Sequence, residues 1–224
     1  MLVIIGLVLL AAILFGPSAW TRWTMRRHSQ DRPDFPGTGG EFARHILDEA
    51  GLEHVPVEVT ERGDHYDPMS KTVRLSGQNL NGRSLTAVAV AAHEVGHALQ
   101  DRDQYGPLKW RTRLATIAMW GQRFAQIIMI ASPATLVASP KIALLQLGAG
   151  LAIMIGQVIV NLVTLPVEFD ASFKRALPIL EQGRYLARDD LNRARSVLRA
   201  AALTYVAGAL FSIINVLRWF RFGR

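Results

Sequence analysis

The chain has 224 residues, half of them hydrophobic, and its 25 Lys and Arg exceed its 18 Asp and Glu to give a formal net charge of +7. This length suits a single domain of ordinary size. The chain has no cysteine, which excludes disulfides, cysteine-ligated metals and a cysteine nucleophile, so any transition-metal site must use His, Asp or Glu.

The first predicted element is an uncharged run over residues 2–20, which as a helix is long enough for about one bilayer crossing. A cleaved signal peptide with its processing site at Pro17-Ser18-Ala19 is the alternative. A signal peptide requires basic residues before its apolar run, and this run has none. A retained membrane anchor is therefore favoured. Arginines follow it at Arg22, Arg26 and Arg27, beside an apolar run, which favours lipid headgroups as the anionic partner. No nucleic-acid-binding signature is present.

Residues 21–107 are predicted to form a mixed α/β region. A helix is predicted over Glu41–Ala50, and strands are predicted over 55–59 and 72–75, on either side of a polar turn at 63–68. Ser84 is a plausible N-cap for a long helix over 84–100. The strand Thr72–Leu75 is either an edge onto which a substrate peptide adds or an ordinary core strand.

The rest of the chain alternates between apolar and charged segments. Pro166 is expected to end a membrane span and to begin a new helix. The predicted segments are an interfacial helix at 108–123, spans at 124–139 and 142–165, a charged segment at 166–199, and a last span at 200–217. The fold class is therefore α+β and predominantly helical, with a mixed unit joined to about four transmembrane helices.

The motif that indicates a catalytic metal site is His93-Glu94-Val95-Gly96-His97. Residues four apart share one helical face, so His93 and His97 can present two nitrogens to one zinc ion. Glu94 can reach a water molecule on that ion without occupying a coordination position, and it is the predicted general base. One zinc ion per chain is expected.

The surrounding helix strengthens this interpretation. Glu94 is the only carboxylate between Ser84 and Gln100, in a run that is otherwise apolar enough to be buried nearly all round. The alternative is that the histidines are satisfied core residues and that Glu94 faces water. That alternative does not account well for three polar groups on a buried helix. Burying an isolated carboxylate costs several kcal/mol of folding free energy.

A zinc protease needs a third protein ligand and an open position. Spacing alone leaves several carboxylates and one further histidine as candidates. These are His65, Asp64, Glu168, Asp170 and Glu181. The residues with side chains that could stabilise an oxyanion are His65, Tyr66 and Arg175.

Four stretches together resemble the bacterial neutral zinc metallopeptidases called YugP-like, and the resemblance covers nearly the whole chain. They are Gly63-Asp64-His65-Tyr66-Asp67-Pro68, Val73-Arg74-Leu75-Ser76, His93-Glu94-Val95-Gly96-His97-Ala98-Leu99-Gln100 and Leu165-Pro166-Val167-Glu168-Phe169-Asp170-Ala171-Ser172. More distantly they are similar to membrane zincins such as HtpX and the prenyl-protein endopeptidases, whose glutamate ligand stands in a Glu-x-x-x-Asp helix. This resemblance implies Glu168 as third ligand. Ser172 stands where those relatives have Asp, so an orienting carboxylate is either missing or supplied by Asp170.

These observations predict a membrane-embedded zinc metalloendopeptidase that cuts membrane-associated proteins or peptides. Its fold is expected to be an α+β zincin-like catalytic unit joined to about four transmembrane helices. The alternative is a zincin-fold binding or scaffold membrane protein without proteolysis. Arg22, Arg26 and Arg27 after the first span put the amino terminus outside a bacterial inner membrane and the active site on the cytoplasmic side. The basic residues Arg218, Arg221 and Arg224 would then lie outside after a fourth crossing. Either the last segment does not fully span the membrane, or these three charges are outweighed by the many basic residues inside, and the second alternative is favoured.

Overall fold

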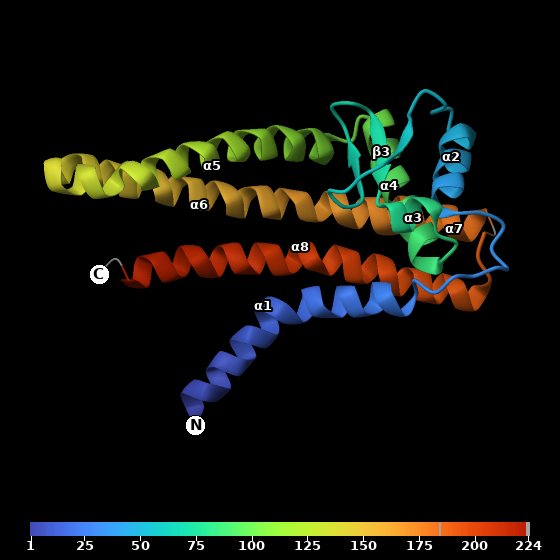
Figure 1. Cartoon of the computed structure of the whole chain (residues 1–224), viewed down its shortest axis with the longest axis horizontal. Helices are drawn as coiled ribbons and strands as arrows, with labels where there is room; N and C mark the ends of the chain where they lie inside the picture. The colour runs from blue at the N-terminus through green and yellow to red at the C-terminus, as the bar shows by residue number, and fades with distance from the viewer. Residues whose placement is uncertain (184, 223–224) are drawn as a thin grey trace.

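The computed structural model describes residues 1–183 and 185–222, and within them it leaves out the side chains of 2–4, 6–10, 13–14, 129, 131–134, 136, 138 and 218–222. The described chain is mostly helical, with one small sheet. Its elements are α1 Leu2–Arg27, α2 Gly39–Glu49, β1 Val57–Val59, β2 His65–Asp67, β3 Thr72–Leu75, α3 Gly77–Asn81, α4 Leu85–Arg102, α5 Gly106–Ala138, α6 Pro140–Phe169, the π-helix η1 Asp170–Ala176, α7 Leu177–Gln182 and α8 Arg188–Phe222. Long helices extend from one compact end, here called the cap, that holds α2, the sheet, α3 and α4 (Figure 1).

The helix starts in the cap are fixed by side chains. Thr38 and Glu41 form a reciprocal capping box at the start of α2, which satisfies two backbone N–H groups that the first helical turn leaves unpaired. At α4, the Ser84 side chain accepts a hydrogen bond from the Ala87 backbone N–H, which confirms the predicted N-cap. The Ser84 cap therefore sets where α4 begins, and with it the positions of His93 and His97 in the helix.

The sheet has the strand order β1-β3-β2, with β1 parallel and β2 antiparallel to β3. The expectation that Thr72–Leu75 could be an edge strand is wrong, because β3 is paired on both sides. The turn predicted over 63–68 contains the short strand β2. A run of His, Tyr and Asp lacks the apolar alternation that indicates a strand, so β2 forms through its pairing with β3 instead.

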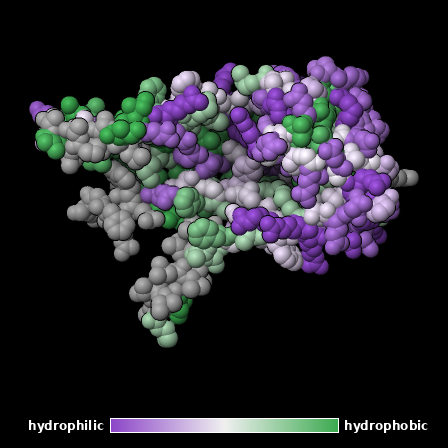
Figure 2. Space-filling view, viewed as in Figure 1, coloured by the Kyte–Doolittle hydropathy of each residue, from purple (hydrophilic) through white to green (hydrophobic). Residues whose placement is uncertain are grey.

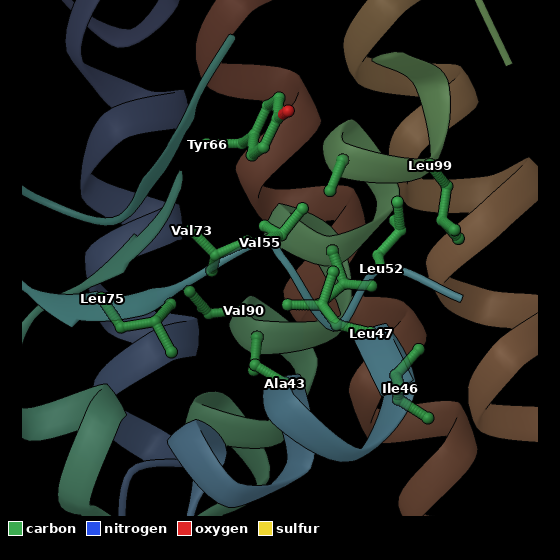
Figure 3. Close-up of a cluster of buried hydrophobic side chains, with 13 residues drawn as sticks. Ala43, Ile46, Leu47, Leu52, Val55, Tyr66, Val73, Leu75, Val90 and Leu99 are labelled. Atoms are coloured by element: carbon green, nitrogen blue, oxygen red, sulfur yellow. The ribbon is translucent and has the colours of Figure 1, made fainter. Parts of the chain in front are cut away.

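The cap has a hydrophobic core between α2, the sheet and one face of α4. Leu47 from α2, Leu75 from β3 and Val95 from α4 are fully buried there. Figure 3 shows side chains of this cluster, among them Leu47, Val55 and Val90. The opposite face of α4 packs on α7, η1 and α8 through a second cluster that includes Ala92, Leu180 and Leu198. Helix α4 is therefore enclosed, and all its residues from Leu85 to Gln100 are buried.

Helices α5 and α6 form a long antiparallel hairpin that projects away from the cap, and α8 runs beside α6 (Figure 1). The segments expected at 108–123 and 124–139 belong to one continuous helix, α5. The prediction that a helix ends at Pro166 is wrong, because α6 continues through it to Phe169 and then passes into the π-helix η1. A proline removes one backbone hydrogen bond, and the packing of this segment on α4 keeps the helix intact.

Within the described residues, two helical stretches are long and apolar enough to cross a membrane, Pro140–Gln182 and Arg188–Leu217. A core helix of a soluble protein also meets this criterion of length and composition. These stretches differ from such a helix in exposure, because only 6% of the most apolar window of the first and 22% of that of the second is buried. The spans expected at 2–20 and 124–139 include many side chains that lie outside the described residues. Figure 2 shows hydrophilic residues gathered over the cap and hydrophobic residues toward the far end of the α5–α6 hairpin.

Candidate metal centre and catalytic site

Three side chains far apart in sequence meet in the buried space between α4 and the end of α6. His93 and His97 come from successive turns of α4, and Glu168 comes from the last turn of α6. The Nε2 atoms of the two histidines are 3.2 Å apart, and Oε2 of Glu168 lies 3.2 Å from His93 Nε2 and 3.5 Å from His97 Nε2. Zinc bonds of about 2.0–2.1 Å in tetrahedral geometry separate ligand atoms by about 3.3 Å. The three atoms therefore fit a zinc ion.

The protonation of His97 follows from its neighbour Gln100. The Gln100 amide nitrogen donates to the backbone oxygen of Val167 at 2.8 Å and to Oδ1 of Asp170 at 2.9 Å. This leaves the amide oxygen of Gln100 to accept a hydrogen bond from His97 Nδ1 at 2.9 Å. Neutral His97 therefore keeps its proton on Nδ1 and presents a lone pair on Nε2 toward His93 and Glu168, as a metal ligand must.

The other members of the cluster also suit a cation. Ser172 from η1 lies with its Oγ 3.0 Å from Nδ1 of His93, which directs Nε2 of His93 inward. Glu168 is 1% exposed, and its Oε1 is buried without a hydrogen-bond partner among the described residues. Its nearest positive group there is the Arg111 guanidinium of α5, at 3.8 Å. A buried carboxylate that faces two imidazole nitrogens is costly unless a cation lies between them.

The π-helix sets this geometry. A hydrogen-bond chain runs outward from Asp170, which accepts from Arg175 Nε at 2.8 Å, while Arg175 Nη1 donates to Asp103 Oδ2 at 2.6 Å. Close approach of η1 to α4 requires Gly96, since a Cβ there would lie 2.8 Å from the backbone oxygen of Ala171. The sequence left open whether an orienting carboxylate is missing or is supplied by Asp170. In the structure Asp170 accepts from Gln100, whose amide oxygen lies against His97, while Ser172 contacts His93 directly.

Glu94 lies beside this cluster and does not belong to it. It is 6% exposed and borders a cavity of about 280 Å³ that His93 also lines. Burial raises the pKa of the Glu94 carboxyl to about 7, although the charge of neighbouring His93 acts in the opposite direction. A carboxyl with a pKa near neutrality is suited to accept and return a proton.

The other candidate ligands are engaged elsewhere. Asp64 reaches the cavity, but its two oxygens accept hydrogen bonds from the Ser76 backbone and the Asn79 amide. His65 Nδ1 pairs with the backbone oxygen of Gly63. Glu181 is exposed on α7. Among the described residues, the cluster that could hold a metal is His93, His97 and Glu168.

Sequence reasoning did not single out Gln100 or Arg111 as parts of the site. Gln100 stands three residues after His97, on the same helical face, so the spacing offered a signal. Arg111 lies on α5, 57 positions before Glu168, and no local pattern indicates that contact. Tyr66 and Arg175, two of the residues suggested to stabilise an oxyanion, bind Asp101 and the Asp170–Asp103 pair.

A helix-borne His-Glu-x-x-His pair completed by a distant glutamate defines the class of zinc metallopeptidases. Residues 2–224 match the family described as "Putative neutral zinc metallopeptidase", and the chain belongs to that family. It is 37% identical over 219 residues to the "Putative membrane protease YugP" of Bacillus subtilis (strain 168), a match that covers 95% of this chain and 94% of the relative. No solved structure matches the chain.

Proposed function

We propose that the protein is a membrane-embedded zinc metalloendopeptidase in which His93, His97 and Glu168 hold one zinc ion and Glu94 is the general base. The observation that carries the proposal is the convergence of the three ligand atoms within zinc-binding distance, with Glu94 outside the cluster at the wall of the adjoining cavity. When bound, zinc supplies Lewis-acid activation of a water molecule and of the scissile carbonyl.

The protein's own residues then transfer the protons and orient the ligands. Glu94 accepts a proton from the attacking water at its carboxylate and later delivers it to the nitrogen of the departing amine. Gln100 and Ser172 hold the two imidazole rings in position throughout. Glu94 is 6% exposed at the wall of the cavity, and this burial raises the pKa of its carboxyl.

The location is proposed to be a bacterial inner membrane, with membrane-associated proteins or peptides as substrates. Support comes from the exposed apolar surface of the two candidate spans and from the name of the Bacillus relative. Glu168 lies at the cap end of the first of these stretches, so the metal centre would sit close to the membrane surface.

The test combines zinc analysis with cleavage of casein, an unfolded substrate, by purified wild type, Glu94→Gln and the exposed control Glu53→Gln. Wild type and Glu53→Gln are expected to bind one zinc per chain and to cut casein. Glu94→Gln is expected to retain the zinc and to lose activity. Equal activity in wild type and Glu94→Gln would exclude Glu94 as the base, and zinc binding without cleavage by wild type would favour a scaffold role.

A further inference from the structure

The cavity beside Glu94 is enclosed by three helices that are distant in sequence. Its walls come from α1, from the turn of α4 that carries His93 and Glu94, and from α8. Thr21 of α1 and Thr204 and Tyr205 of α8 bring hydroxyl groups to it. A peptide carbonyl placed between the zinc ligands and Glu94 would therefore meet side chains of α8.

The two threonine hydroxyls are already hydrogen-bonded to backbone oxygens. Thr21 Oγ1 contacts the backbone oxygen of Ala200 at 2.7 Å and that of Pro17 at 2.9 Å. Thr204 Oγ1 donates to the backbone oxygen of Ala201 at 2.6 Å, within its own helix. Asp64, which also borders the cavity, is an acceptor when ionised and can donate nothing to an oxyanion.

Tyr205 differs from these residues. Its side chain lines the same cavity as His93 and Glu94, on the wall that α8 supplies. A reacting carbonyl placed in this cavity beside Glu94 would therefore come next to the tyrosine side chain. The threonine hydroxyls of this wall and of α1 are bonded to helix backbone, so the Tyr205 hydroxyl is the donor that the helices leave for a bound carbonyl.

We propose that Tyr205 is a catalytic residue whose hydroxyl donates a hydrogen bond to the oxyanion formed during hydrolysis. This rests on the proposed peptidase function. The water oxygen forms a bond to the carbonyl carbon, the π pair of the carbonyl moves to its oxygen, and Glu94 takes the water proton. Tyr205 keeps its own proton and stabilises the new negative charge. As the C–N bond breaks, that charge returns to the carbonyl and the amine nitrogen takes the proton from Glu94.

A hydroxyl held in this way should act mainly in the transition state. A preorganised donor in a site screened from water is worth more than the same donor in solution, because no reorganisation is needed as the charge develops. The expected signature of Tyr205→Phe is therefore a loss in kcat of about 100- to 1,000-fold with little change in KM. Zinc content should be unchanged, since no zinc ligand is altered.

The experiment compares wild type, Tyr205→Phe and Tyr185→Phe, the same chemical change at a tyrosine outside this cavity whose hydroxyl donates to Glu49. A fluorogenic peptide gives kcat and KM. Calorimetry on the zinc-loaded proteins gives the affinity for a phosphinic peptide, which mimics the tetrahedral oxyanion, and for the unreacted peptide in a Glu94→Gln background. Tyr205→Phe is expected to weaken phosphinic binding in parallel with kcat and to leave peptide binding unchanged. Tyr185→Phe is expected to resemble wild type in both.

Three results would overturn the inference. In the first, Tyr205→Phe cuts the peptide as fast as wild type. In the second, its affinities for the phosphinic peptide and for the substrate peptide fall equally, which would indicate a structural or binding role. In the third, it loses zinc, which would make Tyr205 a positioning residue for Glu168. A zinc-loaded wild type that cuts nothing would remove the peptidase proposal itself, and so is distinguishable from all three.

Discussion

The amide oxygen of Gln100 lies 2.9 Å from Nδ1 of His97, and the amide nitrogen of the same residue is held by Asp170 and by the backbone of Val167. The glutamine is fully buried and joins α4 to the segment that carries Glu168 and η1. It thereby fixes both the tautomer of a zinc ligand and the distance between the two elements that supply the ligands.

Replacement of Gln100 by Met should lower zinc affinity by about 10- to 100-fold, the usual cost of losing a group that orients a ligand. The ring of His97 would lose its acceptor and rotate more freely, while the volume of the buried side chain stays similar. Competition with a chelator of known affinity measures the change. Gln78→Met, at an exposed position on α3, is the matched control and should bind zinc as wild type does. Unchanged affinity in Gln100→Met would show that Gln100 only packs.

Glu168→Ala should reduce zinc affinity by more than about 100-fold, because two imidazoles alone hold a tetrahedral site poorly. Asp64→Ala should leave zinc binding intact and instead lower thermal stability, since Asp64 ties Ser76 and Asn79 together. Zinc analysis after dialysis and a thermal melt separate the two effects. The reverse pattern, with zinc lost from Asp64→Ala and kept by Glu168→Ala, would contradict the assignment of the third ligand.

The buried carboxyl of Glu94 predicts a pH effect on the metal-free protein. Its pKa rises from an ordinary 4.5 to about 7 on folding, so the folded state binds more protons than the unfolded state between these values. The free energy of unfolding should then fall as pH rises from about 4.5 to about 7 and remain lower above that range. Glu94→Gln lacks this titration. Urea denaturation of both metal-free proteins at pH 5 and pH 8 should show wild type losing stability relative to Glu94→Gln at pH 8. A constant difference would contradict the prediction.

Gly96 is predicted to be needed for the close contact between α4 and η1. A Cβ at this position meets the backbone oxygen of Ala171 at 2.8 Å, so Gly96→Ala must push η1 away. We expect a loss of about 1–3 kcal/mol in stability and weaker zinc binding, because η1 carries Ser172 and directly follows Glu168. Gly148→Ala on α6 is the control, since nothing lies within 4 Å of its Cβ position. Equal melting temperatures and zinc affinities in the two variants would argue against this account.

The metal-binding helix could be predicted because its signals are local. The spacing of His93 and His97 and the Ser84 N-cap depend on residues within one helix. The contact between Glu168 and His93 spans 75 positions. Spacing gave Glu168 only as one of several candidate ligands, and the resemblance to known proteins singled it out. The contact of Ser172 with His93 follows from the wider turn of η1, which begins just after a proline that suggested a helix end. Such contacts depend on tertiary packing, which no sequence periodicity encodes.

How far α8 extends along α6 determines on which side of the proposed membrane its end is expected to lie. Asn161 of α6 donates to Ser212 of α8 at 2.7 Å, so these positions lie at one level of two antiparallel helices (Figure 1). From there α6 extends back to Pro140 over 21 residues, or about 31 Å, whereas Leu217 is only five residues, or about 8 Å, farther along α8. The described apolar stretch of α8 therefore ends about 24 Å short of the α5–α6 turn. A fourth complete crossing is not needed to place the metal centre on the cytoplasmic side.

We therefore predict that the carboxyl terminus stays on the same side of the membrane as the active site, while the α5–α6 turn reaches the outside. The chain has no cysteine, so the thiol reagent can label this protein only at a single cysteine that is introduced. Intact cells treated with a membrane-impermeant thiol reagent should label Lys141→Cys at the turn. They should leave unlabelled Glu61→Cys in the cap and a cysteine added after Arg224, both of which should react once the cells are opened. Labelling of the added terminal cysteine in intact cells, with Glu61→Cys protected, would show that the last helix crosses completely. Labelling of Glu61→Cys would place the catalytic site outside.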